Sequence, residues 1–191
     1  MFKNIYIYGL GMMGGSIAKA IRVNNPKIKI FGTDIDPKPL KYAKRKKIID
    51  DFDLGEYKFL NKSDLIIICV PMLSYQSVID IIHLHRKSDS LITDIGSTKK
   101  EIIFLVKKNK SINKFFVGSH PLTGKEKASI SHSSADIFRD SYVLISPIGK
   151  SNRKPEKDIS NFWRALNCKT IPVTPETHDK ILSMTSHLPH I

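Results

Sequence analysis

The sequence has 191 residues, of which 41% are hydrophobic and 26% are charged. This length and composition allow one main buried core and exclude the disordered and fibrous classes. The two cysteines, Cys69 and Cys168, lie far apart and form no CxxC pair, so we expect neither a disulfide framework nor a metal site. The segment Met1–Tyr6 enters a strand pattern directly, and no apolar run reaches the roughly 20 residues that a bilayer requires. We therefore expect a cytoplasmic protein without a membrane partner.

The charge of the chain is strongly basic. Lysine and arginine number 31 against 18 aspartate and glutamate residues, which gives a formal net charge of +13. A clustered basic face would indicate a nucleic-acid partner. Here the lysines are spread from Lys3 to Lys180, and no aromatic residues interleave a basic stripe. We interpret the charge as a compositional bias, expect no nucleic-acid partner, and note that an anionic substrate would be attracted.

Short apolar runs alternate with longer segments of helical periodicity, which is typical of βαβ units. Strands are predicted at residues 3–8, 27–33, 65–70, 91–94, 115–118, 142–146 and 169–173. Helices are predicted at residues 13–24, 39–46, 73–85, 98–109, 154–166 and from 175 onward, and the polar residues 129–134 are expected to form a loop or lid. The continuous apolar run Ile66–Ile68 predicts a central strand that is covered on both faces. The pattern indicates an α/β fold with a mostly parallel sheet.

A glycine motif joins the first predicted strand to the first predicted helix, and it reads Gly9-Leu10-Gly11-Met12-Met13-Gly14. Gly9 permits a tight turn, Gly11 lets the backbone approach a pyrophosphate, and Gly14 lets the helix pack closely on the strand. Backbone N–H groups near Met12 and Met13 would face the phosphates at the positive end of the helix dipole. Because the motif also has an acidic residue about 20 positions further on, it predicts a dinucleotide site rather than a ligand-free turn. The expected fold is therefore a Rossmann-like, doubly wound sheet over residues 1–174.

Two further segments complete the predicted cofactor site. Asp34 ends the second strand and is expected on the ribose hydroxyls of the adenosine, with Asp36 as the competing candidate. A carboxylate at this place repels a 2′-phosphate, so the sequence favours NAD over NADP. Val70 and Pro71 leave the central strand at its carboxyl end and should line the crevice in which the cofactor lies.

Many dehydrogenases share the features described so far, and four later segments distinguish this sequence among them. They are residues 94–99, 118–126, 146–147, and 175–179 leading to 186–190. In this order and spacing, they resemble the nucleotide-binding half of prephenate and arogenate dehydrogenases over essentially the whole chain. The combination of Gly-Ser-His-Pro-Leu-Thr-Gly at 118–124 with Ser-His-Leu-Pro-His at 186–190 is highly specific. The resemblance implies NAD-dependent oxidative decarboxylation of prephenate to 4-hydroxyphenylpyruvate in tyrosine biosynthesis. Arogenate remains open as the substrate.

Two candidate catalytic residues follow. Loss of a hydride from a carbinol carbon requires that the hydroxyl proton be accepted, and an unperturbed histidine titrates near neutrality. His120, expected just past a strand, is the candidate, and the resemblance makes it the catalytic histidine of the family. Ser97 is expected at the start of a helix, where its hydroxyl could cap that helix. The resemblance implies that Ser97 contacts the reacting hydroxyl, and the two roles are compatible.

The resemblance also assigns substrate contacts to His190 and Glu126, although Glu126 would suit a solvated surface equally well. His178, Leu182, Ser186 and His190 stand four residues apart, so they share one face of the final helix, which could point into the cleft.

The sequence departs from the family in two respects. Thr123 and Lys125 differ from the residues that commonly follow the His-Pro pair. The sequence also ends at Ile191, within a helix (residues 175–191) that would lead into the helical dimerisation domain of the family. We therefore expect a homodimer only through that further domain, and very low turnover from these residues alone. A different β-hydroxyacid dehydrogenase and a nucleotide-binding module without catalysis are the alternative interpretations.

Overall fold

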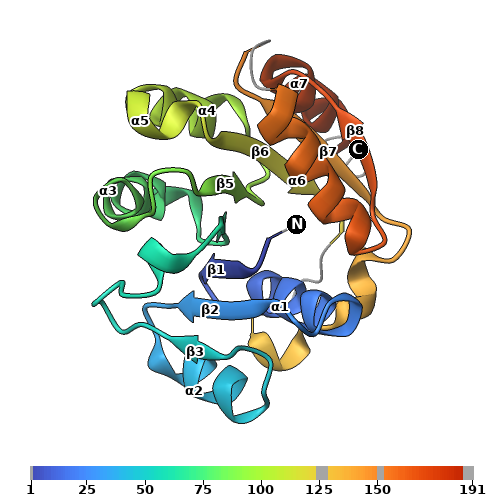
Figure 1. Ribbon diagram of the computed structural model, residues 1–191. Helices are drawn as coiled ribbons and strands as arrows, with labels where there is room; N and C mark the ends of the chain where they lie inside the picture. The colour runs from blue at the N-terminus through green and yellow to red at the C-terminus, as the bar shows by residue number, and fades with distance from the viewer. Residues whose placement is uncertain (1, 124–128, 150–152, 187–191) are drawn as a thin grey trace.

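The computed structural model describes residues 2–123, 129–149 and 153–186. The strands are β1 (Asn4–Tyr8), β2 (Lys29–Thr33), β3 (Asp51–Phe52), β4 (Leu65–Ile68), β5 (Leu91–Asp94), β6 (Phe116–Pro121), β7 (Tyr142–Pro147) and β8 (Lys169–Pro172). They form one sheet in the order β3-β2-β1-β4-β5-β6-β7-β8 (Figure 1). All neighbouring strands are parallel except β6 and β7. The predicted doubly wound, mostly parallel sheet is confirmed.

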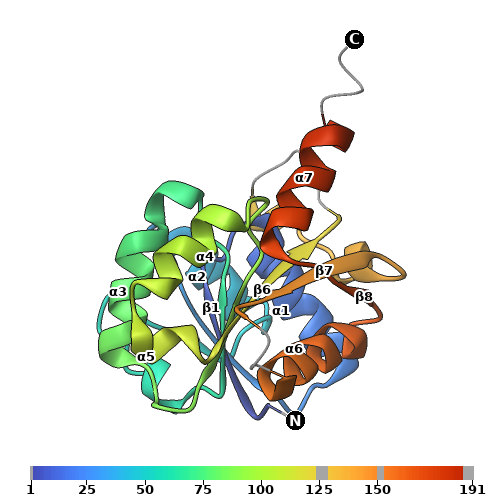
Figure 2. The same ribbon diagram turned by 90° about the horizontal axis from the view of Figure 1, so that it is seen from above.

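Helices cover both faces of this sheet. They are α1 (Met12–Asn24), α2 (Pro37–Arg45), α3 (Tyr75–His85), α4 (Lys100–Lys107), α5 (Lys110–Asn113), α6 (Arg153–Ala165) and α7 (Pro175–Ser186). Short 3-10 helices are η1 (Leu60–Lys62), η2 (Met72–Ser74), η3 (Ile130–His132) and η4 (Ala135–Phe138). Helices α1 and α6 lie on one face, and α3, α4 and α5 lie on the other (Figures 1 and 2). None of the helices in the described ranges is long and apolar enough to cross a membrane.

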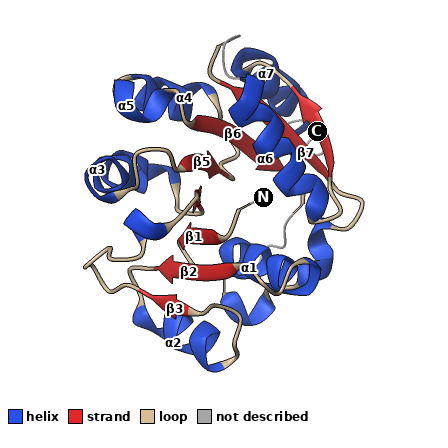
Figure 3. Cartoon of the chain, viewed as in Figure 1, coloured by secondary structure: helices blue, strands red, loops and turns tan. Residues whose placement is uncertain are grey.

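The central strand β4 shows how the two faces are filled. Every residue from Leu65 to Ile68 is buried. Leu65 and Ile67 join the core under α1 and α6, which includes Trp163, whereas Ile66 and Ile68 join the core under α3 and α4. Because successive side chains of a strand point to opposite faces, a strand covered on both sides must be apolar throughout. The prediction of a central strand at this run is confirmed, and Figure 3 shows the sheet between its two helical layers.

Several predicted boundaries are wrong, and each error has a local cause. Strand β3 was not predicted because its two residues, Asp51 and Phe52, are too few to produce a pattern. The helix predicted at 98–109 begins only at Lys100 and ends at Lys107. Strand β6 continues to Pro121 instead of ending at Gly118, because residues 119–121, none of them β-branched, pair antiparallel with β7.

The strand order places the ends of β1 and β4 at a topological switch point. Strand β1 lies between β2 and β4, so the chain builds one side of the sheet as far as β3 and then crosses to build the other. In open sheets of this kind, ligands bind in the crevice outside the carboxyl ends of the strands at such a point. Strand β6 is parallel to β5, which is parallel to β4, so its carboxyl end reaches the same edge.

Candidate active site

The glycine loop after β1 is packed too tightly to carry side chains. Gly9 has a φ of +97°, and a Cβ atom there would lie 2.4 Å from the carbonyl oxygen of Cys69, which follows β4. A Cβ atom on Gly14 would lie 2.0 Å from the carbonyl oxygen of Gly9. Glycine is the residue that tolerates both the positive φ and the close backbone contact. The loop therefore brings the start of α1 directly against the ends of β1 and β4.

The first turn of α1 can accept an anion. Gly11 is the N-cap residue, makes no side-chain capping hydrogen bond, and is followed by Met12 and Met13 in a first turn without an acidic residue. The N–H groups of a first turn have no partner within the helix and carry the positive end of its dipole. A phosphate group suits this position. The residues present thus fit the pyrophosphate of a dinucleotide.

Asp34 lies beside the glycine loop and Asp36 does not. Asp34 follows β2 and is half-buried, and its Oδ2 accepts a hydrogen bond of 2.7 Å from the backbone N–H of Leu10. Asp36 is exposed and caps α2 by accepting from the N–H of Lys38 at 2.9 Å. The structure therefore favours Asp34 over Asp36 as the carboxylate next to the loop.

The segment after β4 also reaches the loop. The Cγ1 of Val70 would lie 3.3 Å from a Cβ atom on Gly9, and Pro71 precedes η2 in an exposed position. The structure thus brings Val70 next to the glycine motif at the switch point, with Pro71 as its neighbour, and their contact with the cofactor stays a prediction.

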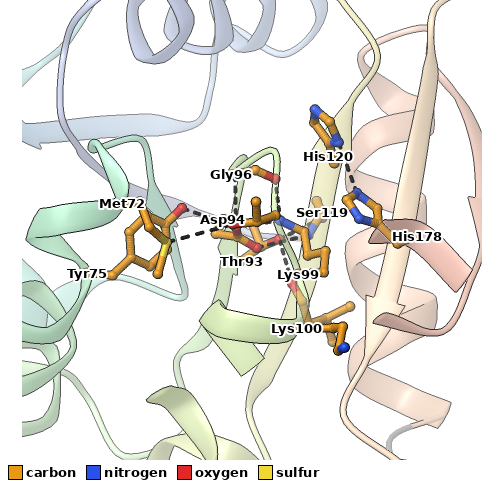
Figure 4. Close-up of polar contacts among 12 residues, drawn as sticks. Met72, Tyr75, Thr93, Asp94, Gly96, Lys99, Lys100, Ser119, His120 and His178 are labelled. Atoms are coloured by element: carbon orange, nitrogen blue, oxygen red, sulfur yellow. Dashed lines mark hydrogen bonds and ion pairs between the residues drawn. The ribbon is translucent and has the colours of Figure 1, made fainter. Parts of the chain in front are cut away.

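A buried ion pair supports the loop between β5 and α4. The side chains of Lys99 and Asp94 are both fully buried, and Lys99 Nζ lies 2.7 Å from Asp94 Oδ2 (Figure 4). The same oxygen accepts from the hydroxyl of Tyr75 at 3.1 Å and from the N–H of Gly96 at 2.8 Å. The other oxygen accepts from the N–H of Ser119 at 3.1 Å. Asp94 therefore ties α3, the loop and β6 to one carboxylate.

Ser119 links β6 to the helical layer that contains α6. Its hydroxyl lies 2.7 Å from the hydroxyl of Thr93 and accepts a hydrogen bond of 2.9 Å from Nε1 of Trp163 on α6. Since neighbouring side chains of a strand point to opposite faces, the Ser119 contacts leave His120 on the other side of β6.

His120 begins a chain of three side chains that ends at the start of α4. Its Nδ1 lies 3.0 Å from Nε2 of His178 on α7, as Figure 4 shows. Nδ1 of His178, which is fully buried, lies 2.7 Å from Oδ1 of Asp179. Asp179 accepts from the backbone N–H of Lys99 at 2.8 Å and of Lys100 at 3.0 Å. One residue pair on α7 thus contacts both the histidine of β6 and the first turn of α4.

The pKa values of this chain of groups favour a neutral His120. Burial, and to a smaller extent the neighbouring Lys99 and His178, lower the pKa of His120 to about 4, and Asp179 opposes them. Burial also lowers the pKa of His178, against its hydrogen bond to Asp179. Burial would raise the pKa of Asp179, but the N–H of Lys100, His178 and the N–H of Lys99 outweigh it and hold that pKa below its usual value. At neutral pH both imidazoles are uncharged, and His120 can accept a proton.

In the described ranges, no group of three or more His, Cys, Asp or Glu side chains is arranged to hold a metal ion.

Comparison with known proteins decides the family. The profile of the family described as prephenate dehydrogenase, nucleotide-binding domain, matches residues 17–172. The chain belongs to the prephenate dehydrogenase family. It is 29% identical to the prephenate dehydrogenase of Bacillus subtilis over 192 residues, which cover 100% of this chain and 52% of that protein. It is 30% identical to the prephenate dehydrogenase of Lactococcus lactis over 191 residues, which cover 99% of this chain and 51% of that protein. The chain thus spans about half the length of these relatives.

Solved structures agree with this assignment. A crystal structure of prephenate dehydrogenase from Aquifex aeolicus in complex with hydroxyphenyl propionate and NAD+ has a TM-score of 0.92 and 29% sequence identity. The match covers 100% of this chain and 66% of that one. Synechocystis arogenate dehydrogenase, at a TM-score of 0.83 and 21% identity, shares the fold, covering 97% of this chain and 65% of that one. The predicted family and the predicted Rossmann-like fold are confirmed.

The structure corrects the placement of both predicted catalytic residues of this prephenate dehydrogenase family member. His120 lies within β6, opposite Leu144 of β7, and not past the end of the strand. Ser97 lies in the exposed loop between β5 and α4. The alternative that Ser97 caps a helix is wrong, because α4 begins at Lys100 and Asp179 accepts from its first N–H groups. Glu126 and His190 lie outside the described residues.

The residues that surround His120 were not predicted from the sequence. The spacing along the final helix placed His178 on a face that could point into the cleft, and this was the available signal. Nothing local indicated that His178 would meet His120, 58 positions earlier, or that Asp179 would meet Lys99 across 80 positions. The burial of Lys99 had no signal either, because lysine is ordinarily an exposed residue.

Proposed function

We propose that this chain forms the nucleotide-binding part of an NAD-dependent prephenate dehydrogenase, which oxidises prephenate to 4-hydroxyphenylpyruvate with release of CO₂. The observation that carries the proposal is the uncharged His120 on β6. This strand ends at the same edge of the sheet as the glycine loop. A proton acceptor at the edge that binds the dinucleotide is what oxidation of a carbinol carbon requires.

The cofactor is NAD. The solved Aquifex aeolicus relative holds NAD+, and the glycine loop and α1 of this chain fit a pyrophosphate. Asp34 is proposed to accept from the ribose hydroxyls and to exclude a 2′-phosphate by charge repulsion. NAD supplies the hydride acceptor of the reaction, and the remaining steps fall to residues of the protein.

His120 is proposed to accept the proton of the substrate hydroxyl at Nε2 as the hydride leaves the ring carbon that bears this hydroxyl. The bond from the ring to its carboxylate then breaks, CO₂ leaves, and the electron pair of that bond makes the ring aromatic. The proton held by His120 returns to the phenolate oxygen. Ser97 is proposed to orient the reacting hydroxyl from the loop before α4. His190 and Glu126 stay predicted substrate contacts.

Prephenate is proposed ahead of arogenate because the Bacillus subtilis and Lactococcus lactis relatives carry that name. A relative from Zymomonas mobilis, named cyclohexadienyl dehydrogenase, is 29% identical over 191 residues, which cover 65% of that protein. Arogenate is therefore the second candidate substrate. A cytoplasmic location and a homodimer formed through a further domain stay predictions of the resemblance.

The test is reduction of NAD by the whole protein, followed at the absorbance band of NADH, with prephenate and arogenate supplied separately. We expect turnover with prephenate, release of CO₂ in equal amount, and a smaller kcat/KM with arogenate. A protein that binds NAD but reduces none with either ring substrate contradicts the proposal and favours a nucleotide-binding module.

A further inference from the structure

We propose that His178 and Asp179 hold His120 in a single tautomer, with the proton on Nδ1 and a free lone pair on Nε2, and so position it as a proton acceptor. The inference rests on the proposed function for the reaction that His120 serves. The tautomer itself is a property of this fold and can be measured without any substrate.

Asp179 sets the direction of the chain of hydrogen bonds. Its two carboxylate oxygens accept from the backbone N–H groups of Lys99 and Lys100 at the first turn of α4. Two N–H donors and the positive end of a helix dipole favour the ionised carboxylate. An ionised carboxylate is only an acceptor, so whatever lies 2.7 Å from Oδ1 must donate to it.

The partner at that distance is Nδ1 of His178, which therefore carries a proton. In a neutral imidazole with one nitrogen protonated, the other nitrogen is an acceptor. Nε2 of His178 thus accepts, and its partner at 3.0 Å, Nδ1 of His120, must donate. The proton of His120 is then on Nδ1. Its Nε2 has no hydrogen bond to the described residues and is left to meet a substrate.

The reverse arrangement fails at one contact. If His120 carried its proton on Nε2, its Nδ1 would accept, and Nε2 of His178 would have to donate. Neutral His178 would then present an unprotonated Nδ1 to the carboxylate of Asp179 at 2.7 Å, with two acceptors facing each other. His178 is fully buried, so water cannot relieve this repulsion.

The charged groups around His120 give this arrangement a role during turnover. Lys99, before α4, faces His120 with a positive charge that is paired with Asp94 of β5, and His178 and Asp179 face it from α7. A proton gained at Nε2 turns His120 into a cation beside Lys99. Asp179, acting through His178, is the negative group that offsets this charge.

A merely structural role for His178 and Asp179, in packing α7 and capping α4, would leave the tautomer of His120 unconstrained. Long-range ¹H–¹⁵N correlation spectra of ¹⁵N-histidine-labelled protein report the tautomer of each histidine and so distinguish a structural role from a positioning role. In the wild type at neutral pH we expect His120 and His178 to be uncharged and protonated on Nδ1. The signals are assigned by their loss in His120→Asn and His178→Leu.

Two variants of His178 and one variant of a distant histidine form the test. His178→Leu removes the acceptor and should shift His120 toward the Nε2-protonated tautomer. His178→Gln offers an amide oxygen in place of the ring nitrogen and should restore the Nδ1-protonated form. His83→Leu is the matched control, because His83 is an exposed histidine on α3 with its own hydrogen bond to Ser111 at 2.8 Å. Should His178→Leu not fold, Asp179→Ala replaces it. This variant removes the acceptor of His178 Nδ1, so the Nδ1-protonated tautomer of His178, and with it that of His120, should no longer be fixed.

Kinetics of the whole protein complete the test. In His178→Leu we expect kcat to fall roughly 10- to 100-fold with KM and NAD affinity little changed, since the base is present but misplaced. His178→Gln should recover most of this loss and His83→Leu should lose nothing. A wild-type His120 protonated on Nε2, a tautomer unchanged in His178→Leu, or a shifted tautomer with normal kcat would each overturn the inference. Failure of the proposed function appears differently, as the expected tautomer without oxidation of either ring substrate.

Discussion

The ammonium group of Lys99 lies 2.7 Å from a carboxylate oxygen of Asp94 with both side chains fully excluded from solvent. Burial lowers the pKa of Lys99 and the charge of Asp94 raises it. Such a pair is weak evidence for net stability, because desolvation of two charges offsets most of their attraction. Its location between β5, α4 and β6 instead indicates that it fixes the loop that carries Ser97 next to the strand that carries His120.

Replacing Lys99 should therefore destabilise the protein strongly. In Lys99→Met the carboxylate of Asp94 keeps its burial but loses its counter-ion, which typically costs about 3–5 kcal/mol in the free energy of unfolding. Urea denaturation measures the difference. Lys100→Met is the matched control, since the side chain of Lys100 is exposed, and it should change stability by less than about 0.5 kcal/mol. Equal effects of the two substitutions would contradict the role given to the buried pair.

Asp34→Ala should weaken NAD binding by about 10- to 100-fold, which corresponds to the roughly 1.5–3 kcal/mol of a charge-assisted hydrogen bond. The wild type should bind NADP more weakly than NAD, and the variant should lose this preference. Titration of both cofactors, followed by protein fluorescence, provides the measurement. Asp36→Ala serves as the control: it removes the cap of α2 but should leave NAD affinity unchanged. An effect confined to Asp36→Ala would transfer the ribose role to that residue.

Gly9→Ala should abolish NAD binding. The new Cβ atom would lie 2.4 Å from the carbonyl oxygen of Cys69, so the backbone of the loop must move. Gly55 offers a control, because its φ of +114° is also positive while a Cβ atom there meets nothing within 4 Å. Gly55→Ala should cost about 1–3 kcal/mol of stability from backbone strain and keep its NAD affinity. Calorimetric titration with NAD distinguishes the two variants. Normal NAD binding by Gly9→Ala would refute the proposal that the cofactor needs the glycine loop in its close contact with Cys69.

His120→Asn should lower kcat of the whole protein by a factor on the order of 10²–10⁴ and leave NAD affinity nearly intact. The amide of asparagine can still donate to His178, so the substitution removes Nε2 while keeping the buried contact. A variant that retained near-normal kcat would move the proton-acceptor role elsewhere, with His190 the next residue to test.

The pH profile of the wild type should be displaced toward acid. The proposed proton-accepting form of His120 is neutral, and its pKa is lowered to about 4 by burial and by the neighbouring Lys99 and His178. Activity should therefore persist below the ordinary titration range of histidine and fall only as the pH approaches that lowered pKa. The measurement is kcat/KM against pH, with circular dichroism to verify folding at each point. An acid limb near neutrality would show that the free enzyme holds His120 in a more solvated setting.

Ser97→Ala should harm catalysis less than His120→Asn. It removes an orienting hydrogen bond and keeps the base, so we expect a loss in kcat/KM equivalent to about 1–3 kcal/mol. Because Ser97 lies in an exposed loop and caps no helix, the melting temperature should stay that of the wild type. A fall in melting temperature without a kinetic effect would assign Ser97 to the fold alone.

The parts of this site that the sequence predicted are those whose physical requirements are local. Gly9 and Gly14 are needed by a turn and a helix start only a few residues long, and Ile66–Ile68 needs both faces of one strand covered. His120 was predicted to lie past the end of a strand but lies within β6, because pairing with β7, and not the local sequence, decides where β6 ends.

The remaining parts depend on contacts between segments far apart in the chain. Lysine at position 99 is polar by every local criterion and is buried only because Asp94 and Gly96 meet its ammonium group. Asp179 acts as a cap for a helix that begins 79 positions earlier. Such roles follow from the packing of α7 against α4, which no periodicity in either helix encodes.

The hydrogen bond from Trp163 to Ser119 has a practical consequence for experiments on this protein. Trp163 is the single tryptophan of the sequence, and its indole nitrogen touches the residue that immediately precedes His120. Tryptophan emission responds to changes in its hydrogen bonding and overlaps the absorption of reduced nicotinamide. The protein thus carries its own optical reporter behind β6, one that can follow movements of this strand and binding of the reduced dinucleotide without an added label.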